Sequence, residues 1–528
     1  MTSLGINNGH ALPSKGGALP LPAPAPAPHL VNATYLSADE ISAWQPYPPP
    51  DAGDGLTPKQ RTVKRIKAAG QWAPWQMIGR RMAIGCVALE ITQRCNLDCS
   101  YCYLSESSEA LKDIPLEEVT RRIDMIFAHY GPNTDVQVTG GDPTLRKRDE
   151  LIAIVRYVKS KGMRASLFTN GIKATRELLS ELCEAGLEDV AFHVDKTQER
   201  TGYASEADLN AVREEYIERA RGLPLAVIFN TTVCPDNFHE IPALAKFFVR
   251  HHDVVRFASF QVGADMGRGV EGHDDARGRM TVNPQTVMAA IREGAQANLH
   301  FDAASAGHAQ CNGYAFGLVI NNKVHDFFND PVFVQAILAS SANITIDRAK
   351  KAGVWRTAAG YLVRHPSTLL GVITRFAKLA WRERRDLIAA RGRVGKISFF
   401  VHNFMDSAQL EKERCDACSF MVMTPDGPIS MCVHNAKRDN YLLVPAKVTR
   451  HNKILYFNPV TGLFDDRIPQ KIEVALSRKN ARGRAKGKLD GGSDAIAVSR
   501  ADDAATAAAA TAATTTTAAE SRRVQAAE

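Results

Sequence analysis

Three cysteines on one short segment, Cys95, Cys99 and Cys102, are the residues of this chain best suited to chemistry. Three thiolates on one loop can bind three irons of a cubane iron–sulfur cluster and leave the fourth iron without a protein ligand. That iron can coordinate a cofactor or a substrate, so such a cluster can take part in a reaction as well as carry an electron. A structural zinc knuckle is the alternative, but zinc needs a fourth Cys or His close by, and the residues that follow contain none.

The elements that must position these cysteines form a regular series between residues 82 and 265, where short apolar runs alternate with longer amphipathic ones. The short runs predict strands at 87–92, 136–139, 165–169, 189–194, 225–232 and 255–261, and the longer runs predict helices at 116–129, 149–161, 174–185, 207–221 and 239–248. Six β–α units in series favour a parallel sheet that right-handed crossovers curl into a full or partial barrel. In such barrels the chemistry sits at the carboxyl ends of the strands, which is where the cysteine loop falls.

Polar residues at the ends of later strands are further candidates. The second predicted strand ends in Gly140-Gly141-Asp142, followed by Pro143 and Thr144. Two glycines let the backbone pass close to a ligand, and the Asp142 carboxylate can accept hydrogen bonds from an ammonium group. Two other strand ends carry polar residues, Asn170 and Asp195. Each of these residues can instead be an ordinary turn or loop-capping residue.

A second group of cysteines lies near the other end of the chain. Cys415 and Cys418 form a Cys-x-x-Cys knuckle, and two strands predicted at 420–424 and 429–433 would return Cys432 to its side. Cys311 is the best available fourth thiol. Four cysteines suit either a closed [4Fe–4S] cluster or a tetrahedral zinc ion, and the first iron–sulfur centre favours a second, auxiliary cluster.

Composition sets outer bounds on the function. The chain has 528 residues and a formal charge of +8, without a basic motif interleaved with aromatics, so we expect no nucleic-acid partner. Thiolate iron sites, together with the lack of a signal-peptide pattern or a long apolar run, predict a cytoplasmic protein. Residues 1–60 are rich in Ala and Pro and residues 478–528 in Ala and Thr, and both ends are expected to be disordered.

One basic segment bears on the substrate. Residues 351–396 contain eleven Lys or Arg and two acidic residues. After Pro366, apolar residues recur at helical spacing, and Trp381, Arg382 and Arg385 follow. A basic amphipathic helix with an aromatic residue is typical of a membrane-surface element, although an ordinary helix packed on the barrel has the same pattern.

The order of these motifs resembles the radical S-adenosylmethionine (SAM) family that contains archaeal tetraether lipid synthase and the dihydro-hydroxymethylpterin methyltransferase. The resemblance runs from the cysteine loop, with Tyr101 before its last cysteine, through the glycine loop and the Cys311 segment to Cys432. It implies an α/β fold with a partial (β/α)6 TIM-type radical SAM barrel at 81–270, a helical region at 271–400 and an auxiliary-cluster region at 401–470. The relatives carry further metal-binding cysteines ahead of the barrel, where this chain has only Cys86.

The resemblance also implies cofactors and roles. A [4Fe–4S] cluster on the three cysteines would reduce SAM to a 5′-deoxyadenosyl radical, which would functionalise an unactivated carbon, for example of a lipid. The residues implied to contact SAM are Tyr101, Gly140, Gly141, Asp142, Thr144, Asn170 and Asp195. A reducing partner such as flavodoxin or ferredoxin is expected, with a small-molecule or lipid substrate and, in the lipid case, peripheral contact with the inner membrane surface. The alternatives are a methyltransferase acting on a pterin-like molecule and a non-catalytic iron–sulfur electron carrier.

Overall fold

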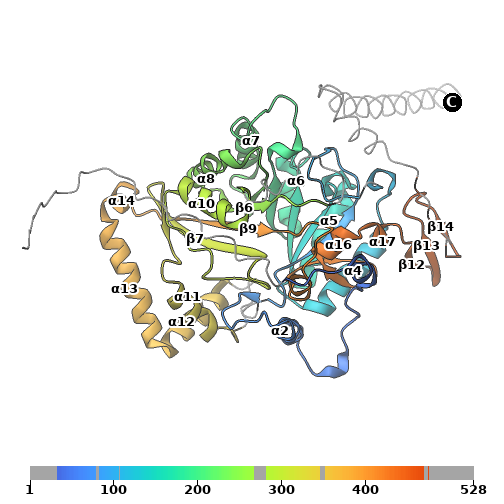
Figure 1. Ribbon diagram of the computed structural model, residues 1–528, viewed down its shortest axis with the longest axis horizontal. Helices are drawn as coiled ribbons and strands as arrows, with labels where there is room; N and C mark the ends of the chain where they lie inside the picture. The colour runs from blue at the N-terminus through green and yellow to red at the C-terminus, as the bar shows by residue number, and fades with distance from the viewer. Residues whose placement is uncertain are drawn as a thin grey trace, which may run out of the picture. The chain divides into compact units, whose positions relative to one another are not determined.

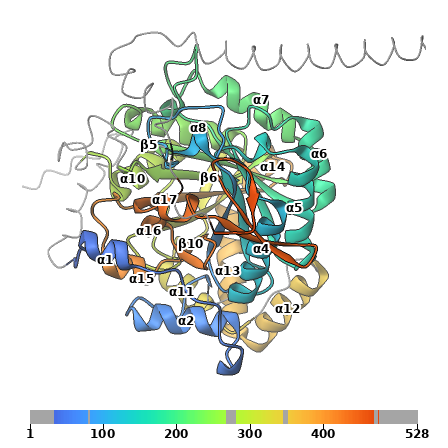
Figure 2. The same cartoon turned by 90° about the vertical axis from the view of Figure 1, so that its right-hand side faces the viewer.

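The computed structural model describes residues 33–78, 82–105, 107–266, 281–344 and 351–468, together with Ile472 and Val474 (Figures 1 and 2). Most of the predicted disorder, at 1–32 and 478–528, lies outside these residues. The Ala/Pro-rich composition predicts disorder up to residue 60, whereas 33–60 contains α1 (Ala38–Ala43) and the start of α2 (Pro58–Ala68). Both helices begin with a capping box, Ser37 with Glu40 and Thr57 with Gln60, which satisfies backbone N–H groups of the first turn. Composition averaged over a window does not register such local signals.

Eight parallel strands form the centre of the fold. Their order in the sheet is β10-β1-β2-β3-β4-β5-β6-β9, and all the pairings in this series are parallel. Their bounds are β1 (Cys86–Thr92), β2 (Asp135–Gly140), β3 (Arg164–Thr169), β4 (Leu187–His193), β5 (Ala226–Val233), β6 (Val255–Val262), β9 (Gly395–Asn403) and β10 (Phe420–Met423). The predicted α/β fold with a parallel sheet is therefore confirmed, and two strands from the C-terminal half extend the predicted six.

Amphipathic helices cover the outer face of this sheet. They are α4 (Leu116–Tyr130), α5 (Arg148–Ser160), α6 (Arg176–Ala185), α7 (Asn210–Ala220), α8 (Ile241–Arg250) and α10 (Pro284–Ala295). In α4, Val119, Ile123 and Ile126 recur at helical spacing and are fully buried in the main core, which contains residues of β1 and β2. Gly131, at a φ of 74°, ends α4 because a residue with a positive φ cannot continue a right-handed helix.

The series of eight parallel strands curls until its first strand, β10, and its last strand, β9, lie close together. No ladder between described strands joins β9 to β10, yet side chains from the two strands touch across the gap: the ring centroids of Phe420 lie 6.0 Å from Phe400 and 4.5 Å from His402. Aromatic contacts at these separations are favourable and pack the seam. The partial barrel is thus completed by side chains where backbone pairing stops.

The remaining strands and helices lie around this barrel. Region 271–400, predicted to be helical, also contributes β7 (Asn312–Ile320) and β8 (Lys323–Asp326), which extend the sheet beyond β9 in antiparallel fashion. Gly313 and Gly317 obscure β7 in the sequence because glycine disfavours strands, but a Cβ there would lie 2.3 Å from Met288 and 2.6 Å from Val324. The other elements are α11 (Pro331–Ser340), α12 (Lys351–Arg364), α13 (Pro366–Arg382), α14 (Arg384–Ala389), α15 (Lys412–Asp416), α17 (Asp439–Leu442) and a small sheet of β12 (Ala446–Arg450), β13 (Lys453–Phe457) and β14 (Phe464–Asp465).

One predicted strand is wrong. The pattern predicts a strand over 429–433, whereas the chain forms a short β11 (Pro428–Ser430) and then turns into α16 (Met431–Ala436). Cys432 therefore sits in the first turn of a helix. A short apolar run fits one helical turn as well as a strand, so periodicity alone cannot separate the two.

Candidate active site

The predicted cysteine loop lies at one end of a large cavity. Cys95, Cys99 and Cys102 follow β1, and all three line a cavity of about 590 Å³ inside the barrel. The Ser100 N–H donates to the Thr197 carbonyl oxygen at 2.9 Å, which ties the cysteine loop to the loop after β4. Tyr101 also lines the cavity and lies against Gly263 at the end of β6. The three thiols and Tyr101 thus share one wall.

The two glycines of the Gly140-Gly141 turn hold this loop in place. A Cβ on Gly140 would lie 1.9 Å from the Thr92 carbonyl oxygen, and one on Gly141 would lie 2.0 Å from the Arg94 carbonyl oxygen. The Gly141 N–H donates to the Thr92 oxygen at 2.9 Å. Any side chain here would push the cysteine loop away, so glycine is required for packing as well as for an approach to a ligand. Both glycines also line the cavity.

Asp142 faces the protein rather than the cavity. Its buried carboxylate accepts hydrogen bonds from the backbone N–H groups of Thr144 and Asn170, at 3.0 and 2.8 Å, and from the hydroxyl of Thr169. Burial raises the pKa of Asp142, and these hydrogen bonds offset part of the rise. The carboxylate joins the ends of β2 and β3. Neither Asp142 nor Thr144 is among the residues that line the cavity, and their predicted contact with SAM stays a prediction.

Of the two other strand-end candidates, Asn170 lines the cavity and Asp195 does not. The Asn170 amide lines the cavity and donates to Asn96 Oδ1 at 2.7 Å, beside the thiol of Cys95. Asp195 is fully buried and does not line the cavity; it accepts a hydrogen bond from the Thr232 N–H at 2.7 Å. Of these two residues, only Asn170 can meet a ligand directly in this arrangement.

His193 reaches the cavity in place of Asp195, and sequence reasoning missed it. Its Nε2 lies 2.6 Å from Asp195 Oδ2, and the ring lines the cavity. Burial alone would lower the pKa of His193, but the Asp195 carboxylate outweighs burial and raises it. Burial alone would raise the pKa of Asp195, but His193 and the hydrogen bonds from Thr197 and Thr232 outweigh burial and lower the pKa to about 2. The available signal was position, since His193 is the last residue of β4 and strand ends carry the chemistry in such barrels.

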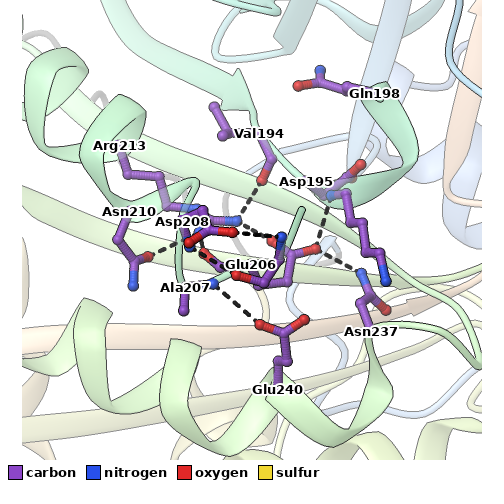
Figure 3. Close-up of polar contacts among 12 residues, drawn as sticks. Val194, Asp195, Gln198, Glu206, Ala207, Asp208, Asn210, Arg213, Asn237 and Glu240 are labelled. Atoms are coloured by element: carbon purple, nitrogen blue, oxygen red, sulfur yellow. Dashed lines mark hydrogen bonds and ion pairs between the residues drawn. The ribbon is translucent and has the colours of Figure 1, made fainter. Parts of the chain in front are cut away.

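A buried ion pair supports the loop that carries Asp195 (Figure 3). Arg213 and Glu206 are ion-paired with their side chains almost wholly out of solvent. The Glu206 carboxylate also accepts from the Lys196 N–H at 2.9 Å and from Asn237 Nδ2 at 2.7 Å, and Arg213 donates to the Val194 carbonyl oxygen at 2.9 Å. The network joins β4, the loop after it, α7 and the loop after β5, and so fixes the segment that anchors the cysteine loop.

The second set of cysteines comes together at the seam between β9 and β10. Cys311, Cys415, Cys418 and Cys432 interact electrostatically with one another, and the last three are buried. Burial and the neighbouring thiol of Cys418 raise the pKa of Cys432 to about 12. Crowded thiols in a dry site favour a bound metal centre, since metal coordination stabilises their thiolate forms.

Two arginines brace this second set. Arg414 is buried, and its Nε approaches the Cys311 sulfur at 3.4 Å while its Nη2 donates to the Asn403 carbonyl oxygen at 2.6 Å. Arg65, on α2, donates to the Asp416 and Cys418 carbonyl oxygens at 2.9 and 2.7 Å. Helix α2 therefore holds the Cys415–Cys418 knuckle through Arg65, and Arg414 places a positive charge beside the thiols.

Both cysteine sets fit iron–sulfur clusters by the chemistry of their donors. Among the described residues, no three Cys, His, Asp or Glu side chains are arranged around a single metal ion. That finding concerns single ions, whereas the thiolates of a cubane each bind a separate iron. Three cysteines on one loop beside a cavity suit a cluster with one open iron, and four neighbouring cysteines, three of them buried, suit a closed cluster.

Comparison with known proteins agrees with the first of these sites. The model of the radical SAM superfamily matches residues 89–248. The chain is 27% identical over 200 residues to a 7,8-dihydro-6-hydroxymethylpterin dimethyltransferase of Methanocaldococcus jannaschii, covering 37% of this chain and 39% of that protein. It is 31% identical over 166 residues to a PqqA peptide cyclase of Bradyrhizobium diazoefficiens, covering 31% of this chain and 43% of that protein. The matches thus span about two-fifths of the length of these relatives.

A third relative and one solved structure complete the comparison. An Fe-coproporphyrin III synthase of Methanosarcina barkeri is 31% identical over 163 residues, which cover 30% of this chain and 39% of that protein. The solved structure of anSMEcpe with bound AdoMet is 16% identical, covers 40% of this chain and 59% of that chain, and has a TM-score of 0.30. That structural overlap is too small to add to the sequence matches. Over residues 89–248 the chain therefore carries a radical SAM domain, whose cofactors are a [4Fe–4S] cluster and S-adenosylmethionine.

Proposed function

We propose that this protein cleaves SAM reductively and uses the 5′-deoxyadenosyl radical to remove hydrogen from an unactivated carbon of a substrate held in the barrel. The observation that supports this most strongly is the placement of Cys95, Cys99, Cys102 and the Gly140-Gly141 turn on one cavity of about 590 Å³. Formation of 5′-deoxyadenosine and methionine by the reconstituted, reduced protein tests it.

The chain's own residues bind, orient and exclude water. Cys95, Cys99 and Cys102 would hold the cluster, which when bound supplies the electron for cleavage of SAM. Tyr101 and Asn170, which both line the cavity with the thiols, would contact SAM. His193, held by Asp195, can donate a hydrogen bond into the cavity from its other ring nitrogen. The aromatic contacts between β9 and β10 pack the seam of the barrel, and exclusion of water from the barrel would protect a radical from stray hydrogen donors.

The four cysteines at the seam support an auxiliary [4Fe–4S] cluster. We expect Cys415→Ala to lower the iron content of the reconstituted protein by about four atoms per chain, since one whole cluster loses a ligand. Iron and zinc are measured by elemental analysis, with Cys183→Ala in α6 as the matched control. Unchanged iron, or loss of zinc in place of iron, contradicts a second cluster. A flavodoxin or ferredoxin is the reductant that these redox centres call for.

A lipid substrate is supported by the exposed surface of α12 and α13. Of the residues described, no helix is long and apolar enough to span a bilayer. Helix α13 has no buried residue, and Trp355 and Trp381 are 76% and 72% exposed. In Figure 1 α13 lies at the edge of the fold. Arg382, its last residue, and Arg385, on α14, are exposed. The apolar face that could have packed on the barrel is therefore largely uncovered, and a basic, Trp-bearing surface of this kind complements an anionic bilayer.

Charge reversal on this surface tests the membrane contact. We expect the protein to float with anionic phosphatidylglycerol vesicles and Arg382→Glu/Arg385→Glu to lower the bound fraction more than about tenfold, since each basic residue near an anionic surface contributes roughly 1 kcal/mol. Lys64→Glu/Lys67→Glu, on the exposed side of α2, is the control and should float normally. Absence of binding by the unmodified protein, or equal binding by all three, contradicts the contact.

A methyltransferase acting on a pterin-like molecule is the second candidate. One relative named above is a pterin dimethyltransferase, and polar side chains such as Gln137, Asn230 and Ser259 line part of the cavity. Retention of a pterin by the purified protein would favour this candidate over a lipid.

A further inference from the structure

Two basic side chains line the far end of the cavity from the cysteine loop. Arg256 is the second residue of β6 and Lys396 the second residue of β9, and these strands are adjacent and parallel. Both residues line the same cavity as Cys95, Cys99 and Cys102. The cysteine loop follows the carboxyl end of β1, so the cations and the thiols occupy opposite ends of the barrel. At 3.3 Å per residue, the six residues from Arg256 to the end of β6 span about 20 Å.

Neither cation is neutralised by the part of the protein that the structure describes. Arg256 donates to the His252 carbonyl oxygen at 2.7 Å, and neither Arg256 nor Lys396 has a carboxylate partner among the described residues. The contrast is Arg164, at the same end of β3, which is paired with Asp135, Glu188 and Asp189 at 2.6 to 2.8 Å. On that side three carboxylates surround the Arg164 guanidinium, with Lys159 as a second partner of Glu188. The side formed by β6 and β9 instead carries two basic side chains without a carboxylate partner among the described residues. A guanidinium beside an ammonium is a common way to bind phosphate or carboxylate groups.

Aromatic rings occupy the wall above these cations. Phe257 follows Arg256 in the sequence, and its ring centroid lies 5.7 Å from Phe400 and 6.1 Å from Tyr314. Phe400 in turn contacts Phe420 at 6.0 Å, and all four rings line the cavity. An anionic group at Arg256 and Lys396 would leave the rest of its molecule against this apolar wall. A small polar ion would make no favourable apolar contact with this wall.

We propose that Arg256 and Lys396 bind the anionic head group, phosphate or carboxylate, of an amphiphilic substrate whose apolar chain extends along the aromatic wall toward the cysteine loop. The identification of this ligand as the substrate rests on the proposed function, but binding of the ligand can be measured without turnover. It specifies the ligand as anionic at one end and apolar along its length, with the reacting carbon remote from the charge.

Binding of monomeric dodecyl phosphate to the reconstituted full-length protein, measured by isothermal titration calorimetry, tests the proposal. We expect Arg256→Gln/Lys396→Gln to weaken binding about tenfold or more, since charge-assisted hydrogen bonds are lost. Lys64→Gln/Lys67→Gln on α2 is the matched control and should bind like the unmodified protein. Dodecanol should bind more weakly because it lacks the charge, and inorganic phosphate more weakly because it lacks the chain. Thermal unfolding of the double variant checks that it is folded.

The outcomes separate this inference from the proposed function. Equal affinity of the cavity variant and the unmodified protein for dodecyl phosphate overturns it, as does tight binding of inorganic phosphate alone, which would indicate a free-phosphate site. Preference for an acidic peptide over dodecyl phosphate overturns it in favour of a peptide substrate. A protein that binds dodecyl phosphate through Arg256 and Lys396 but does not cleave SAM keeps the head-group site and removes the proposed function.

Discussion

Replacement of Cys99 by alanine is expected to abolish the formation of 5′-deoxyadenosine from SAM. The three cysteines of the loop share one cavity wall, so removal of one leaves a cluster with two protein ligands. Removing residues that only support metal ligands typically costs 10–100-fold in metal affinity or activity, so loss of a ligand should lower the rate by more than about 100-fold. The measurement is anaerobic product analysis by liquid chromatography and mass spectrometry after reduction with dithionite.

The control for this prediction is Cys183→Ala. Cys183 lies on α6, whose buried residues face the outer side of the sheet, and it is not among the residues that line the cavity. This variant should cleave SAM at the unmodified rate. If the unmodified protein binds a cluster but makes no 5′-deoxyadenosine, the chain is better described as an iron–sulfur electron carrier, and the proposed function fails.

Glu206→Gln is expected to lower the free energy of unfolding by about 3–5 kcal/mol. Arg213 has no exposed surface, and Glu206 is its carboxylate partner. A glutamine can still accept one hydrogen bond from Asn237 or Lys196, but it leaves the guanidinium charge uncompensated in a dry site, which costs about this much. The measurement is urea unfolding followed by circular dichroism, with attention to cooperativity because the chain is large.

Two further variants interpret that result. Glu215 lies on α7, the helix that also carries Arg213. Glu215→Gln removes a carboxylate that is 59% exposed and should change the free energy of unfolding by less than about 1 kcal/mol. Glu206→Gln/Arg213→Met removes both charges and should recover part of the loss, because no unpaired charge stays buried. Equal stability of Glu206→Gln and Glu215→Gln would show that the buried pair does not hold the loop after β4.

The local part of the fold could be predicted from the sequence. The first six strands and the helices between them differ from their predicted bounds by only a few residues, because β-branched runs and helical periodicity are signals contained within each segment. The pairing of β10 with β1 was not predictable in the same way. It joins Phe420 to Cys86 across more than 300 residues, and no local pattern specifies a partner at that distance.

Part of the candidate site could likewise be predicted from the sequence and part could not. The cysteine loop and Gly140-Gly141 fall on the cavity where the strand ends predict them. Asp142 and Asp195 point into the protein and away from the cavity, because each carboxylate caps the short turn that follows it. A sequence does not show which way a strand-end carboxylate points. Arg256 and Lys396 went unnoticed because a single basic residue near the start of a strand has the same pattern as a solvated strand end.

The central claim is that Cys95, Cys99 and Cys102 hold a [4Fe–4S] cluster with one iron open to SAM. Low-temperature electron paramagnetic resonance of the dithionite-reduced protein, recorded with and without SAM, tests it most directly. The account predicts a reduced-cluster signal that SAM shifts in the unmodified protein and that loses this response in Cys99→Ala. A signal indifferent to SAM, or no iron and no acid-labile sulfide after anaerobic reconstitution, would contradict it.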